Sequence, residues 1–185
     1  MTRTRSLAVA AAVFAVVVLF ALGVPLLNKA VSPTIDVGGE TFDLAGVTIV
    51  APEQTLMRPG FYQPGSGRIE FLVGDAEVDI AVAGPYDFDA EYLAEEMARL
   101  LETQPGVRLT DPRACDADGV EGAGRSFVTE TGAGFACAFV HGDIRAEVTA
   151  TVSSIGSGSG VAASLSSRTA ERVDELIAQL DFETA

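Results

Sequence analysis

Apolar and polar residues alternate over much of the chain after residue 42. Residues 68–73 and 76–82 alternate in this way on either side of Gly74 and Asp75, which predicts a β-hairpin with one buried face and one partly charged face. An apolar run at 47–51 that ends at Pro52 predicts an earlier strand. Further strands are expected at 107–110, 124–131, 134–140 and 144–152.

Two other segments carry an apolar stripe at helical spacing. The first stripe is Leu93, Met97, Leu100 and Leu101, which predicts a helix at about 89–103 with Asp87 or Asp89 as its N-cap. The second is Val173, Leu176, Ile177, Leu180 and Phe182, which predicts a helix at about 167–181 capped by Ser166 or Ser167. The predicted fold class is α+β, a mainly antiparallel β-sheet with two amphipathic helices packed on it.

An uncharged apolar stretch at 7–27 precedes this domain. As a helix its 21 residues span about 31 Å, the thickness of a hydrocarbon core. Arg3 and Arg5 lie before it, so the positive-inside bias places the N-terminus in the cytoplasm. We therefore expect a cytoplasmic N-terminus (1–6), a transmembrane signal anchor (7–27), a tether (28–41) and an extracytoplasmic domain (42–185). A cleaved secretory signal, which would release the domain, is the alternative.

The charge of the chain is distributed unevenly. Residues 31–185 hold all 26 acidic residues and 9 of the 12 basic ones, which leaves a net charge of −17. A strongly negative domain repels nucleic acid and the anionic lipid surface. We therefore exclude nucleic acid as a partner, and we expect the membrane to be contacted only through the N-terminal helix.

The only two cysteines, Cys115 and Cys137, both fall in the predicted outer domain. Disulfides persist outside the cytoplasm, so we predict a structural disulfide between them. Two unpaired buried thiols are the alternative. The spacing excludes a C-x-x-C redox site, and two Cys with one His are a poor zinc ligand set.

The order of these elements resembles that of a known fold. A first strand ending in Val50-Ala51-Pro52, a hairpin, a mid-chain helix, a meander and a C-terminal helix are similar to the PsbP-like fold. That fold also occurs in small secreted or membrane-anchored proteins of actinobacteria, and the Lys-poor, Ala- and Gly-rich composition is typical of a GC-rich bacterial source. The resemblance implies binding or scaffolding in a cell envelope rather than a shared chemistry.

Motifs that bind cofactors or metals are not evident. The Ser- and Gly-rich segment 153–167 matches neither the dinucleotide fingerprint nor the P-loop, so no cofactor is predicted. Asp116 and Asp118 lack the further ligands of an EF-hand, which leaves a weak calcium site as an alternative to a solvated turn. His141, the single histidine, is expected as an exposed residue of a hairpin tip.

Aromatic residues in expected loops are the best candidates for an interaction site. Phe61 and Tyr62 lie in a Pro- and Gly-rich stretch, and Tyr86 follows the predicted hairpin. Aromatic side chains on loops make good partner contacts. The alternative is that these side chains fold back and cap the sheet.

Three functions remain open. The favoured one is a membrane-anchored extracytoplasmic module that binds or scaffolds another envelope protein and is not an enzyme. The second is a carrier of an apolar small ligand, such as a lipid or cell-wall precursor, held in a pocket beside Leu93 and Met97. The third is a hydrolase that uses a pair of acidic residues, for which the sequence identifies no particular pair.

Overall fold

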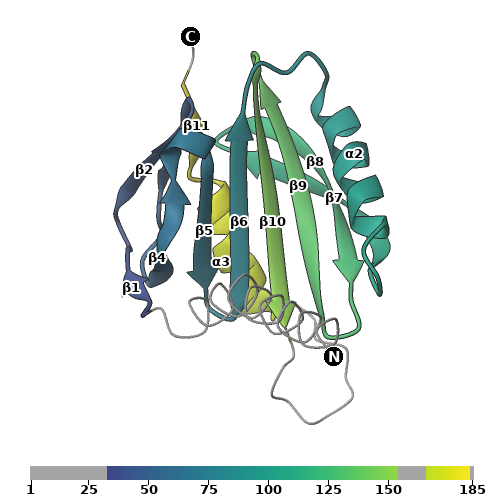
Figure 1. The fold of residues 1–185 in the computed structure, drawn as a ribbon, viewed down its shortest axis with the longest axis horizontal. Helices are drawn as coiled ribbons and strands as arrows, with labels where there is room; N and C mark the ends of the chain where they lie inside the picture. Colours follow the sequence, from purple (N-terminus) through teal and green to yellow (C-terminus); the bar gives the residue numbers. More distant parts are fainter. Residues whose placement is uncertain (1–32, 154–165, 184–185) are drawn as a thin grey trace, which may run out of the picture. The chain divides into compact units, whose positions relative to one another are not determined.

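The computed structural model describes residues 33–153 and 166–183. The chain divides into two units, 1–33 and 34–185, and the second contains the domain described below (Figure 1). The predicted anchor at 7–27 and most of the Ser- and Gly-rich segment lie outside the described residues. None of the helices in the described part is long and apolar enough to cross a membrane.

An antiparallel sheet of eight strands forms the centre of the domain. Its strand order is β1-β4-β5-β6-β10-β9-β8-β7, and each neighbouring pair is antiparallel. The strands are β1 (Ile35–Asp36), β4 (Thr55–Gln63), β5 (Arg68–Val73), β6 (Ala76–Ala83), β7 (Arg108–Ala117), β8 (Val120–Val128), β9 (Gly132–His141) and β10 (Ile144–Ser153). The predicted α+β class and the hairpin of β5 and β6 are confirmed.

Two helices were expected and both are present in the described part of the chain. Helix α2 (Ala90–Glu102) begins after Asp89, whose side chain accepts a hydrogen bond from the backbone N–H of Tyr92. Helix α3 (Ser167–Ile177) begins after Ser166, whose hydroxyl accepts one from the backbone N–H of Thr169. Both caps satisfy a donor that the first helical turn leaves unpaired.

The second helix is shorter than predicted. It ends at Ile177, and β11 (Leu180–Phe182) forms a small antiparallel sheet with β3 (Val47–Val50) and β2 (Thr41–Leu44), in the order β11-β3-β2. Leu180 and Phe182 are buried, as the helical stripe also required. The apolar pattern fits both structures at this point, and backbone pairing with β3 selects the strand.

The two helices lie on opposite faces of the large sheet. In β9, Phe135 and Phe139 join the main core, which also contains buried residues of α3 and of the small sheet. The alternate residues Ala136 and Ala138 pack against Leu93, Ala94 and Met97 of α2. Since successive side chains of a strand point to opposite faces, α3 covers one face and α2 the other. Figure 1 shows α3 at β5 and β6, and α2 over β7 to β9.

The domain begins earlier than the expected boundary at residue 42. Ile35 and Asp36 pair with Met57 and Leu56 of β4, and Val37 is fully buried. Residues 34–41 therefore belong to the domain and not to a tether. The Gly38-Gly39 pair, which suggested a linker, forms the turn between β1 and β2.

The disulfide between Cys115 and Cys137 is present, and β7, which contains Cys115, extends beyond the predicted 107–110 because it pairs with β8 as far as Ala117. Cys115 in β7 and Cys137 in β9 lie on either side of β8, and their Cα atoms are 6.1 Å apart. Strands separated by a third strand are ordinarily about 9.5 Å apart, so the sheet bends sharply here. Gly124 of β8 permits this, because a Cβ there would lie 2.9 Å from the Sγ of Cys115.

Candidate functional site

Three aromatic side chains gather at the start of α2. The rings of Tyr86 and Phe88 meet edge to face with centroids 5.6 Å apart, and those of Phe88 and Tyr92 stack at 4.6 Å. Phe88 is 55% exposed and Tyr92 40% exposed, which is unusual for such large side chains. We call Tyr86, Phe88 and Tyr92 the aromatic patch.

The local chain conformation holds the aromatic patch in place. The backbone N–H of Tyr86 donates to the carbonyl oxygen of Asp143, 2.9 Å away in the turn between β9 and β10. Asp89 then caps α2 by accepting from the N–H of Tyr92 at 2.8 Å. Tyr86 is therefore attached to the turn between β9 and β10, and Tyr92 to the capped start of α2, with Phe88 between them in the chain.

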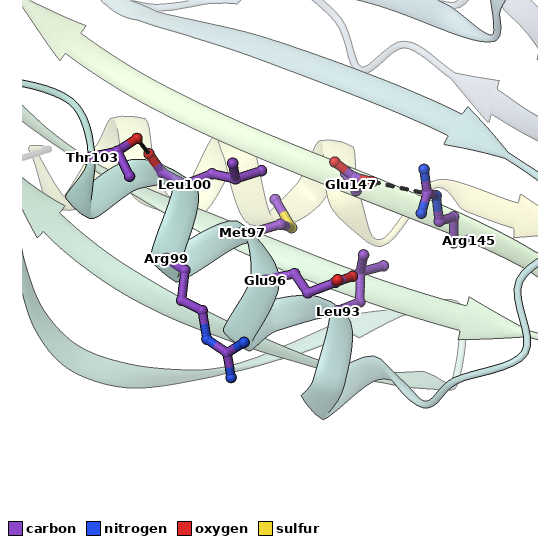
Figure 2. A pocket seen from close by; sticks show the side chains of 8 residues that line it. All are labelled: Leu93, Glu96, Met97, Arg99, Leu100, Thr103, Arg145 and Glu147. Carbon is purple, nitrogen blue, oxygen red and sulfur yellow. Dashed lines mark hydrogen bonds and ion pairs between the residues drawn. The ribbon is translucent and has the colours of Figure 1, made fainter.

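A groove runs beside α2, over the face of the sheet that the helix leaves open. Figure 2 shows its lining, which is Leu93, Glu96, Met97, Arg99, Leu100 and Thr103 of the helix with Arg145 and Glu147 of β10. Its volume is about 470 Å³. Most helical members lie on one stripe from Leu93 to Thr103, which is ten steps of about 1.5 Å, so the groove is about 15 Å long. We call this the α2 groove.

Tyr86 joins the aromatic patch to the α2 groove. Its hydroxyl donates a hydrogen bond to the Oε2 of Glu96 at 3.2 Å, and the guanidinium carbon of Arg145 lies 5.0 Å from its ring centroid. Both partners line the groove. Burial, followed by the hydrogen bond and the charge of Glu96, raises the pKa of Tyr86 above its ordinary value. The patch and the groove form one continuous surface.

The surroundings of the aromatic patch are acidic. The thirty residues 69–98 contain nine Asp or Glu and no Lys, Arg or His. Asp87, Asp89 and Glu91 alternate with the aromatic residues and are exposed. A ligand at the aromatic patch therefore meets apolar rings and negative charge together.

The open face of the sheet next to the α2 groove carries ion pairs. Arg58 of β4 contacts Glu70 at 2.9 Å and Glu77 at 3.5 Å, and Arg68 pairs with Asp79. These pairs join β4, β5 and β6 on the face opposite the main core, and the pair of Arg58 with Glu77 reaches across β5. A charged face of this kind is solvated as it stands and does not require an apolar cover.

Phe61 and Tyr62 are not in a loop as predicted, because β4 extends through both. The strand interrupts its pairing with β5 between Met57 and Tyr62, and the Pro- and Gly-rich residues that suggested a loop, Pro64 to Gly67, follow the end of β4. Tyr62 packs edge-on against Phe42 at 5.2 Å and donates its hydroxyl to the carbonyl oxygen of Asp43. Phe61 is half-buried beside it. The structure thus groups Tyr86 with Phe88 and Tyr92 and packs Tyr62 onto the core.

The remaining candidate residues lie elsewhere. His141 is the last residue of β9 rather than part of the tip, and its ring lies 5.9 Å from that of Phe182. The Oδ1 of Asp116 accepts a hydrogen bond from the N–H of Gly119, and Asp118 has a positive φ in the turn between β7 and β8. Across 33–153 and 166–183, no three His, Cys, Asp or Glu side chains come together as metal ligands.

Phe88 and Tyr92 were missed by the sequence reasoning. Tyr92 precedes Leu93 and lies off the apolar stripe of α2, so its exposure follows from the helical period. Phe88 lies just before the capping Asp89, outside the periodic segment. The sequence pattern that could have predicted the aromatic patch is the alternation of aromatic and acidic residues from Tyr86 to Tyr92.

No protein-family model matches the chain, and no curated protein matches it in sequence. The structure is similar to the solution structure of cyanobacterial PsbP (CyanoP) from Synechocystis sp. PCC 6803, with 13% identity and a TM-score of 0.45, over 77% of this chain and 91% of that one. This is the PsbP-like fold that the order of elements resembles.

A second solved structure, from Bacteroides thetaiotaomicron VPI-5482, is similar with 15% identity and a TM-score of 0.33. The match covers 83% of this chain and 49% of that one, so the chain spans about half the length of the Bacteroides protein. At such identities the likeness concerns the fold alone. A shared fold does not by itself imply a shared function.

Proposed function

We propose that this chain is a membrane-anchored, extracytoplasmic module that binds another protein of a bacterial cell envelope and has no catalytic role. The aromatic patch and the α2 groove are its binding surface in this proposal. The anchor rests on the uncharged segment 7–27 and the basic residues before it. The extracytoplasmic location is supported by the disulfide, since disulfides are rare in the cytoplasm.

The exposed stack of Phe88 and Tyr92 is the observation that carries the proposal. At 55% and 40% exposure the two side chains leave on the order of 200 Å² of surface in water. At about 25 cal/mol per Å², covering this surface would contribute about 5 kcal/mol before the costs of association are subtracted. A partner gains this energy without reorganising the domain, because the cap of α2 already positions the rings.

The apolar-ligand carrier is the second candidate, because the α2 groove lies beside Leu93 and Met97, where that hypothesis places its pocket. The groove is open, however, and Glu96, Arg145 and Glu147 face it. An acyl chain laid there would desolvate these charges without replacing their hydrogen bonds. The lining therefore fits a polar polypeptide better than a lipid. Among the described residues, no observation favours a hydrolase.

The proposal is tested by photo-crosslinking the full chain in native membranes. A photoreactive amino acid replaces Tyr92 in the aromatic patch or, as a control, the exposed Glu175 of α3. We expect one identified envelope protein to crosslink at position 92 and not at 175, to be lost on Phe88→Ser, and to bind the chain when purified. Equal patterns at both positions would contradict the proposal. Lipid recovered in equimolar amount with the purified chain would favour the carrier instead.

A further inference from the structure

We infer that the aromatic patch recognises an arginine side chain on an extended segment of the partner protein. The inference rests on the proposed binding function and adds the chemistry of the occupant. It is carried by the way exposed aromatic rings and carboxylates are interleaved between Tyr86 and Tyr92, and by the groove that continues from them.

The negative charge around the aromatic patch favours a positively charged ligand group. Asp87, Asp89 and Glu91 are exposed next to the stacked rings, and the segment 69–98 contains no basic residue. The two arginines that line the α2 groove already have partners, since Arg145 lies over Tyr86 and Arg99 pairs with Glu95 at 3.2 Å. Among the described residues no arginine or lysine lies over the rings of Phe88 or Tyr92. These two rings and their acidic neighbours are complementary to a positive group from outside.

The domain already uses the same arrangement internally. The guanidinium carbon of Arg113 lies 3.9 Å from the ring centroid of Phe135, and the same guanidinium pairs with Asp174 of α3. A planar guanidinium can stack on a ring and donate in its plane to a carboxylate, whereas an ammonium group offers no flat surface to stack. The aromatic patch presents the ring and the carboxylates of this arrangement on the surface.

The α2 groove adds a second anchor point. Leu100 is 66% exposed at its far end, and Leu93 and Met97 form its apolar wall. The groove is about 15 Å long, which an extended chain covers in four to five residues at about 3.3 Å each. The expected segment therefore has an arginine at the aromatic patch and an apolar side chain four or five residues away, near Leu100.

Binding is measured by fluorescence anisotropy with labelled peptides and the full chain in nanodiscs. The probe peptide is a tandem repeat of Arg-Gly-Ser-Gly-Leu, and matched peptides carry Lys or Glu for Arg, or Ser for Leu. We expect the Arg peptide to bind at least threefold more tightly than the Lys peptide. The Glu peptide should show no binding, and the Leu-to-Ser peptide should bind more weakly than its parent.

Two charge-matched double variants separate recognition from general attraction to an acidic domain. Asp87→Asn with Glu91→Gln removes two negative charges at the aromatic patch, and Glu171→Gln with Glu175→Gln removes two from exposed positions of α3. We expect the first pair to weaken binding at least fivefold and the second less than twofold. Equal effects would overturn the inference, because they would indicate non-specific attraction.

The variant Phe88→Ser with Tyr92→Ser should abolish the preference for Arg over Lys. Its melting temperature is measured in parallel, and an unchanged value shows that the loss is not due to unfolding. Displacement of the peptide by zwitterionic lipid vesicles, without discrimination among peptides, would assign the patch to lipid and overturn the inference. If the Arg peptide fails to bind while position 92 still crosslinks to an envelope protein, the inference is wrong and the proposed function stands.

Discussion

The disulfide is expected to contribute a large part of the stability of this domain. It closes a loop of 22 residues between Cys115 and Cys137. In the chain-entropy model a loop of this length stabilises the folded state by about 3 kcal/mol. For a domain of this size, each kcal/mol corresponds to about 2–4 °C, so the double variant Cys115→Ala with Cys137→Ala should melt about 6–12 °C lower.

The structure also predicts where the loss is felt. Strand β7 is an edge strand that pairs only with β8, and that pairing shifts between Leu109 and Pro112. The disulfide ties the second half of β7 to β9 across β8. Without it, the backbone amides of 113–117 should exchange with solvent faster, while those of β6 and β10 at the centre of the sheet keep their protection.

Thermal and urea denaturation of the full chain, followed by circular dichroism, would measure this contribution. The wild type is compared with the double variant, each with and without reductant. Reductant should lower the stability of the wild type to that of the variant and leave the variant unchanged. A loss of less than about 1 kcal/mol would refute the reasoning, since strand pairing alone would then hold β7 in place.

Three further predictions concern single side chains. Gly124→Ala should destabilise the domain by about 1–3 kcal/mol in a urea titration, because the added Cβ would lie 2.3 Å from a carbonyl oxygen of β9. The control Gly65→Ala should leave the free energy of unfolding nearly unchanged, because a Cβ there has no heavy atom within 4 Å. Tyr62→Ser should cost about 3 kcal/mol, since the ring packs on the core; an unchanged melting temperature would return Tyr62 to the list of partner contacts. Because the pKa of folded Tyr86 is raised, its contribution to stability is present below pH 10 and is lost as pH rises through the folded value; Glu96→Ala should lower that pKa in a phenolate absorbance titration, because it removes both the hydrogen bond and the charge, and no change would contradict the contact between Tyr86 and Glu96.

Local pattern was enough to predict much of the fold. The alternation in 68–73 and 76–82, the stripe of Leu93 and Met97, and the capping Asp89 all describe interactions between near neighbours in the chain. Where the pattern fitted two structures, the prediction failed, as at Leu180 and Phe182. These residues form a strand and not a helix because their backbone pairs with β3, which lies more than 130 residues earlier in the chain.

The candidate site was predicted less well than the fold. Tyr86 was identified from its position after the hairpin, but its neighbours Phe88 and Tyr92 were not, because exposure is a property of the assembled surface. Leu100 was expected to be buried and is exposed, for the same reason. It continues the helical stripe of α2, yet it is 66% exposed, since the large sheet does not cover that part of the helix.

By itself, the sequence determined the α+β class, the hairpin of β5 and β6, two candidate caps for each helix and the acidic charge, because each depends on residue type and on neighbours within one or two turns. Only the tertiary structure decided that α2 covers β7 to β9 on one sheet face and leaves a groove beside it. Only the tertiary structure brought Tyr86 into contact with Glu96 and Arg145, which line that groove. These contacts join the end of β6, α2 and β10, and the packing of distant segments, not the order of residues within any one of them, sets which side chains remain exposed.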